Sequence, residues 1–341
     1  MKKRFCVLLT ALLLLLSVLP LFSCGGGRVL KKEVYGKFDT VCTLYDYSGE
    51  GEESFDRKAA LFLSLLSEYD AHFDIYGEPA EGTIAYLNHM AGQGRVDILP
   101  DVEGLLLFGV EIYEMTRGTV NIAMGAVTSL WHDARCADEP YLPSDTDISE
   151  AMRHCGIENF SLPGDGTAAI YDPEMSLDVG AIAKGYAAEL IAKKLENAGY
   201  TSLVIDLGGN LRAVGTKPGG GGFETGIKNP LGSGYSARLT LSDNAVATSG
   251  AYERKMTVGG REYGHITDPA TGYPADNFAS VSVLSADAGM ADALSTALFI
   301  LSYEDGETLL SYLARRGVPG APTYAVWVMK DGSVIEFTPG D

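Results

Sequence analysis

Apolar and polar positions along the chain alternate with two different periods, which predict four helices and several short strands. Helical spacing occurs over 55–73, 102–116, 183–198 and 288–302, and Gly199 closes the third helix. Alternation with a period of two predicts strands over 38–47, 202–207, 210–214, 237–241, 279–284, 324–329 and 334–337. Residues 208–209 and 330–333 are expected to turn between paired strands. Helices and strands mix without a regular βαβ repeat, so the pattern favours an α+β fold.

Residues 1–23 have the pattern of a targeting segment. Lys2, Lys3 and Arg4 precede an apolar run over 5–22, which ends in Leu-Phe-Ser and then Cys24. This ending is similar to a lipobox, although Phe22 is bulkier than the usual residue, and ordinary secretion or an uncleaved anchor are the alternatives. We therefore expect a signal peptide over 1–23, a flexible tether over 24–33 and one domain over 34–341. Lipid on Cys24 would hold that domain on the extracytoplasmic face of the cell membrane.

Composition narrows the function classes. The chain has 341 residues, of which 46% are hydrophobic, enough for one large core or two modest ones. Its net charge of −19 argues against nucleic-acid binding, because phosphates would be repelled. The cysteines after Cys24 are Cys42, Cys136 and Cys155, without the Cys-x-x-Cys spacing of a zinc or iron–sulfur site. Cys136 and Cys155 could form a disulfide or remain thiols.

The first candidate for chemistry is His265, which stands beside a rigid turn. Residues 263–274 read Tyr-Gly-His-Ile-Thr-Asp-Pro-Ala-Thr-Gly-Tyr-Pro. The prolines restrict the backbone and Gly272 can take a positive φ, so His265 would be positioned at little entropic cost. With an ordinary pKa near ~6.5 it could accept a hydroxyl proton at neutral pH. The alternative is a polar turn with an incidental histidine.

The second candidate is an oxygen pair on the helix over 288–302. Asp292 and Thr296 stand at i and i+4 and therefore share one face. A carboxylate in an apolar helix is costly unless it is paired or bound to a cation. Oxygen ligands with room for water and substrate phosphates suit Mg²⁺. The alternative is an aspartate hydrogen-bonded to a neighbouring loop.

The third candidate is the small-residue loop over 177–186, which leads into a helix. Free N–H groups at a helix start can bind an anion, and Gly180 and Gly185 allow close approach to the backbone. Lys184 adds a positive charge, and Asp178 adds an acceptor for a base or ribose. Packing alone is the alternative for such a loop.

Six motifs in order resemble the ApbE family of FAD:protein FMN transferases: residues 178–186, 207–210, 226–230, 247–252, 265–274 and 292–296. The resemblance covers roughly residues 34–337. It implies an ApbE-like, T-fold-like α+β fold with mixed, largely antiparallel sheets flanked by helices. It also implies Mg²⁺-dependent transfer of FMN from FAD to a Thr or Ser hydroxyl of a target flavoprotein, with release of AMP. Membrane or extracytoplasmic redox flavoproteins are the implied targets.

The resemblance also implies roles for single residues. Asp292 and Thr296 match side-chain metal ligands, Ala181 and Ser295 match backbone ones, and His265 matches the base. The matches to FAD-contacting positions are Phe38, Tyr76, Thr119, Val120, Asn121, Asp178, Lys184 and Ile266. Asp39 and Asn121 depart from the family pattern, which puts flavin affinity in doubt more than the chemistry. An FAD pyrophosphatase yielding FMN and AMP, or a non-catalytic FAD-binding lipoprotein, are the alternatives.

Overall fold

An eight-stranded sheet forms the centre of the computed structural model, which describes residues 28–340 except 251 and 253. Its order is β1-β2-β6-β7-β10-β13-β14-β15, and each neighbouring pair is antiparallel. The strands are β1 (Leu30–Lys37), β2 (Thr40–Asp46), β6 (Leu203–Leu207), β7 (Asn210–Val214), β10 (Ala245–Gly250), β13 (Ser280–Ser285), β14 (Tyr324–Val328) and β15 (Val334–Phe337).

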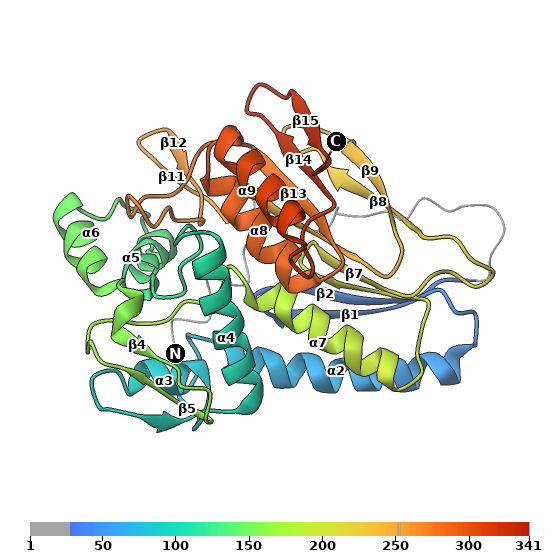
Figure 1. Ribbon diagram of the computed structural model, residues 1–341, viewed down its shortest axis with the longest axis horizontal. Helices are drawn as coiled ribbons and strands as arrows, with labels where there is room; N and C mark the ends of the chain where they lie inside the picture. Colours follow the sequence, from blue (N-terminus) through green and yellow to red (C-terminus); the bar gives the residue numbers. More distant parts are fainter. Residues whose placement is uncertain (1–27, 251, 253, 341) are drawn as a thin grey trace.

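Helices cover one face of this sheet, as Figure 1 shows. They are α2 (Glu52–Phe73), α7 (Ala183–Asn197), α8 (Ala288–Ile300) and α9 (Tyr303–Arg316). Alternate residues of β6 point into this layer: Leu203, Ile205 and Leu207 are fully buried in the main core. Helix α8 is buried along nearly its whole length, so any polar side chain on it must find partners inside the protein.

The opposite face of the sheet carries a separate hairpin. It consists of β8 (Phe223–Lys228) and β9 (Tyr235–Leu241), which pair with each other and not with the large sheet. Phe223 and Leu241 pack on Val204, Leu211 and Val246, the outward-pointing residues of the sheet strands. This hairpin therefore lies away from the helices.

The remaining elements lie beside the sheet. They are α3 (Ile84–His89), β3 (Val96–Asp97), α4 (Pro100–Met115), α5 (Gly125–Cys136), α6 (Asp145–Ala151), η1 (Met152–His154), η2 (Ile157–Asn159), β4 (Phe160–Ser161), β5 (Thr167–Ile170), β11 (Met256–Val258) and β12 (Arg261–Tyr263). Helix α4 contributes to the main core, whereas α5, α6 and β11 share a smaller one around Trp131. This smaller core supports the turn that follows β12.

The α+β class is confirmed, and all four predicted helices are present within three residues of their expected ends. Gly199 has the expected positive φ of 84° after α7. The predicted strand over 38–47 was wrong at its start, because Phe38 and Asp39 form the turn of the β1–β2 hairpin at φ of 50° and 53°. Strand β1 begins at Leu30, inside the range expected for the flexible tether.

Several predictions concern residues that the structure does not describe. The signal peptide over 1–23 and Cys24 fall in this part of the chain. Between residues 28 and 340, leaving out 251 and 253, no helix is long and apolar enough to span a membrane. Cys136 and Cys155 are both thiols and share no disulfide.

Candidate active site

The turn after His265 is as rigid as its prolines and glycine predict. The Asp268 N–H donates to the Tyr273 carbonyl at 2.8 Å, and the Gly272 N–H donates to the Asp268 carbonyl at 2.8 Å. Gly272 has a φ of 76°, and an added Cβ would lie 2.7 Å from Ile148. The Trp131 indole donates to the Gly272 carbonyl at 2.7 Å, so helix α5 anchors the turn from a distant part of the sequence.

His265 lies among positive charges. Burial, then Arg254, Lys184 and Arg135, lowers its pKa to about 3. This pKa lies well below the ordinary value that the motif alone suggests. The shift arises from the loss of solvent and from three cations that lie outside the motif. Its Nδ1 atom is buried and has no hydrogen-bond partner among the described residues. The imidazole is neutral at pH 7 and can accept a proton.

Asp292 lies where helices α7 and α8 approach each other most closely. A Cβ on Gly185 would lie 2.3 Å from the Ala288 carbonyl oxygen and 2.4 Å from the Asp292 Cβ, so only glycine fits there. The Gly185 N–H donates to Asp292 Oδ2 at 2.8 Å. It belongs to the first turn of α7, where backbone N–H groups have no helical acceptor. Asp292 therefore caps α7 at its positive end through one oxygen.

The electrostatics of Asp292 reflect this burial. The residue is 5% exposed, and burial raises its pKa. The Lys184 charge, the Gly185 N–H and the Asn210 amide act in the opposite direction. Asn210 is itself buried, and its Nδ2 makes no hydrogen bond of ordinary geometry within the described part of the chain. Lys184 acts on both His265 and Asp292, which links the two predicted motifs electrostatically.

Hydroxyl groups surround the second predicted ligand on α8. Ser249 Oγ lies 3.2 Å from Thr296 Oγ1 and 2.8 Å from Ser295 Oγ. Ser295 Oγ donates to the Asp292 carbonyl at 2.9 Å. The Ser295 side chain is therefore engaged within the protein, whereas Asp292 and Thr296 share one buried face of the helix as their spacing predicts.

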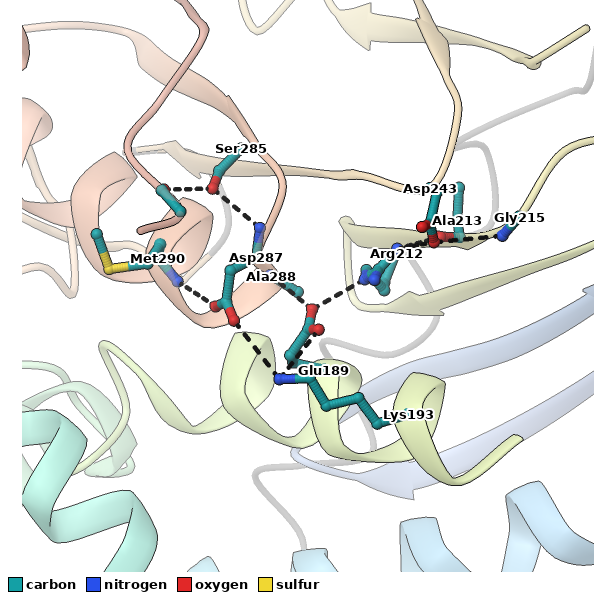
Figure 2. A network of polar contacts seen from close by, with 11 residues as sticks. Glu189, Lys193, Arg212, Ala213, Gly215, Asp243, Ser285, Asp287, Ala288 and Met290 are labelled. Atoms are coloured by element: carbon teal, nitrogen blue, oxygen red, sulfur yellow. Dashed lines mark hydrogen bonds and ion pairs between the residues drawn. The ribbon is translucent and has the colours of Figure 1, made fainter. Parts of the chain in front are cut away.

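A buried ionic network fixes α7 against α8 and β7, as Figure 2 shows. Glu189 accepts from Arg212 Nε at 2.8 Å and from the Ala288 N–H, at the start of α8, at 3.0 Å. Lys193 lies 3.3 Å from the other Glu189 oxygen and 3.9 Å from Asp287, the N-cap of α8. These contacts hold the pKa of Glu189 below its ordinary value although burial raises it. The network sets the depth at which α8 presents Asp292.

Several predicted flavin-contacting residues lie near the same charges. The half-exposed Tyr76 ring stacks on His132 at 4.4 Å, and Asp178, Arg135 and Arg254 act electrostatically on its hydroxyl. Arg254 also donates to the Phe38 carbonyl at 3.4 Å. Tyr76 and His265 therefore face two of the same arginines.

Other predicted positions are engaged within the protein. Asp178 Oδ1 accepts from the Gly180 N–H at 2.8 Å, and Ile266 packs on the main core. Asn121 accepts from the Ala123 N–H at 2.9 Å and donates to the Cys155 carbonyl at 3.0 Å, so its amide holds its own loop. Val120 is buried and Thr119 is half-buried beside it. Ala181 lies just before α7, and no described residue donates to its carbonyl.

The sequence predicted no role for four residues that shape the site, Ser249, Arg254, Arg135 and His132, and for Gly185 it predicted only close approach to the backbone. Ser249 and Arg254 lie in or just after the motif over 247–252, and Gly185 lies in the loop motif, so a local signal existed for these three. Arg135 and His132 lie on α5, where no pattern marked them.

The fold and the buried α7–α8 junction define a class of protein, which comparison with known proteins identifies. The ApbE family model matches residues 38–318, and the chain belongs to this family. The FAD:protein FMN transferase of Treponema pallidum is 32% identical over 320 residues, covering 86% of this chain and 87% of that protein. The enzyme of the same name from Klebsiella pneumoniae is 31% identical over 253 residues, covering 73% and 77%.

Solved structures agree with this placement. The ApbE protein of Thermotoga maritima superposes with a TM-score of 0.80 at 25% identity, covering 92% of this chain and 97% of that one. The flavin transferase ApbE of Vibrio cholerae superposes with a TM-score of 0.77 at 22% identity, covering 92% and 98%, which shows the shared fold.

Proposed function

We propose that this protein transfers FMN from FAD to a Thr or Ser hydroxyl of a target flavoprotein and releases AMP. The observation that carries the proposal is that the Lys184 charge acts on both His265 and Asp292, in a chain that belongs to the ApbE family. Relatives of this chain are named FAD:protein FMN transferases, and they match it over most of its length.

The residues at the α7–α8 junction fit a magnesium ion. Asp292 Oδ2 accepts from the Gly185 N–H, and the Lys184 charge and the Asn210 amide act on the same carboxylate. The Thr296 hydroxyl and the Ala181 carbonyl are oxygen donors, and a carboxylate with neutral oxygens is the donor set that Mg²⁺ prefers. When bound, the ion would neutralise negative charge on the FAD diphosphate. Ser295 would offer its backbone oxygen, because its hydroxyl donates to the Asp292 carbonyl.

The protein's own groups would perform the transfer. The Lys184 charge, at the start of α7, would orient the diphosphate. The target hydroxyl oxygen would form a bond to the FMN phosphorus as the bond from that phosphorus to the AMP oxygen breaks. His265, which is neutral at pH 7, would take the hydroxyl proton. The products are the FMN phosphoester of the target and AMP.

We also propose where the reaction occurs. The basic start and apolar run of residues 1–23, followed by Cys24, support a lipid-anchored protein on the extracytoplasmic face of the membrane. The targets would then be extracytoplasmic or membrane redox flavoproteins with an acceptor Thr or Ser.

Incubation of the full chain with FAD, Mg²⁺ and a candidate flavoprotein domain tests the activity. We expect the intact mass of the target to increase by one FMN less one water, and AMP to appear in equal amount. His265→Ala should abolish transfer while FAD binding persists. Release of FMN and AMP with an unmodified target would instead indicate a hydrolase, and the absence of both products would indicate a binding protein.

A further inference from the structure

Three buried hydroxyls form a chain between strand β10 and helix α8. Ser249 is 6% exposed, Ser295 is fully buried and Thr296 is 8% exposed. Ser249 Oγ lies between the other two, at 2.8 Å from Ser295 Oγ and 3.2 Å from Thr296 Oγ1. Each hydroxyl has one proton to donate, so the direction of each bond can be derived.

The direction is fixed from the Ser295 end. Ser295 donates its only hydroxyl proton to the Asp292 carbonyl, at 2.9 Å. Ser295 Oγ can therefore only accept in its contact with Ser249 Oγ. Ser249 must donate its own hydroxyl proton to Ser295. The remaining contact of Ser249, with Thr296, must then have Thr296 as the donor.

The other acceptor that Thr296 could use is already filled. A threonine in a helix commonly donates to the carbonyl four residues earlier, here that of Asp292. In α8 that carbonyl accepts a helical N–H and also the Ser295 hydroxyl, which together use both of its lone pairs. Thr296 is left with Ser249 as its acceptor.

We propose that Ser249 is a positioning residue that binds the Thr296 proton and so directs the Thr296 lone pairs toward a divalent cation. A hydroxyl whose proton pointed toward the cation would repel it. The inference rests on the proposed metal site, to which it adds a residue on a different element. Groups that orient metal ligands in this way commonly change metal affinity by about 10- to 100-fold when they are removed.

Strand β10 provides a matched control. Thr248 points to the opposite face from Ser249 and shares a hydroxyl–hydroxyl bond of 2.7 Å with Ser282 of β13. Ser282→Ala therefore removes the hydroxyl–hydroxyl bond between Thr248 and Ser282, which joins β10 to β13 on the face opposite to Ser249. Any general effect of losing such a bond will appear in this variant.

The experiment measures Mn²⁺ binding to the full chain by electron paramagnetic resonance, without turnover. We expect Ser249→Ala to weaken binding about 10- to 100-fold and Ser282→Ala to change it less than twofold. In a Thr296→Ala background, Ser249→Ala should have almost no further effect, because the hydroxyl that it orients is gone. Thermal melts identify variants whose fold is lost. If Ser249→Ala only destabilises the protein, its effect on binding should be equal with and without Thr296, so the Thr296→Ala background separates this case from the proposed role.

Two results would overturn the inference: binding by Ser249→Ala equal to that of the wild type, or an equal loss with and without Thr296. A failure of the proposed metal site looks different. In that case the wild-type protein would bind no Mn²⁺, or Asp292→Ala would bind it as tightly as the wild type.

Discussion

Gly185→Ala perturbs the site through the smallest possible change. The new Cβ would lie 2.3 Å from the Ala288 oxygen and 2.4 Å from the Asp292 Cβ, whereas ordinary contacts begin at 3.4 Å. The two helices must therefore separate by about 1 Å, because the obstructing atoms are backbone or directly attached to it. This separation would lengthen the 2.8 Å bond from the Gly185 N–H to Asp292.

The expected magnitudes differ for stability and for metal binding. Overpacking of this kind lowers the free energy of unfolding by about 1–3 kcal/mol, whereas the better helix propensity of alanine raises it by about 1 kcal/mol. The free energy of unfolding should therefore fall by at most about 2 kcal/mol. A ligand misplaced by about 1 Å can cost on the order of 100-fold in activity, and we expect Mn²⁺ affinity to fall at least 10-fold.

Urea unfolding and Mn²⁺ titration of the same preparation measure both quantities. Gly306→Ala is the matched control, since Gly306 is a helical glycine of α9 that also packs on α8. Its Cβ would meet the end of Leu298 at 3.0 Å and the Trp327 ring at 3.3 Å, both of them side-chain atoms, and no predicted ligand. The reasoning is refuted if Gly185→Ala binds Mn²⁺ as tightly as the wild type, or if Gly306→Ala loses affinity equally.

Two other predictions concern charge. Glu189→Ala leaves Arg212, which is 6% exposed, without its buried partner, and we expect urea unfolding to show a loss of about 3–5 kcal/mol. The exposed Glu196 of the same helix provides the control, and equal losses in the two variants would contradict the network's role. For His265, the lowered pKa keeps the imidazole neutral as pH falls, so kcat/KM should show no loss between pH 8 and 6. Arg254→Gln removes a positive charge, raises the His265 pKa and should move the acidic limb to higher pH; a downward shift would argue against this assignment.

Local patterns predicted four of the helices, although the amphipathic α9 was not among them. Helices α2, α4, α7 and α8 have clear apolar spacing, and the turn over 268–274 is specified by its own prolines and glycine. Helix α5 buries Val127, Trp131 and Ala134 at helical spacing, but glycine, histidine and charged residues interrupt this stripe in the sequence. Phe38 and Asp39 adopt positive φ although neither is a glycine, so the alternating pattern did not reveal the turn at the start of the predicted strand.

The residues of the candidate site also fall into two groups, those that a local motif marks and those whose role depends on distant contacts. His265, Asp292 and Thr296 stand in local motifs, and their residue types indicate their chemistry. The importance of Gly185 depends on Asp292, 107 residues away, and that of Ser249 depends on Thr296, 47 residues away. Glu189 accepts from the first N–H of α8, which is 99 residues away. Such roles arise from contacts between elements, which spacing along the chain does not encode.

The central claim is that one site, built around Asp292 and His265, moves FMN to a protein hydroxyl. Intact-mass measurement of a candidate flavoprotein, incubated with FAD, Mg²⁺ and the full chain, tests it most directly. We expect the mass of the target to increase by one FMN. This increase should be absent when Mg²⁺ is chelated and in the His265→Ala and Asp292→Ala variants. A target that stays unmodified while the wild-type protein releases FMN and AMP from FAD, or a transfer that survives both substitutions, would contradict it.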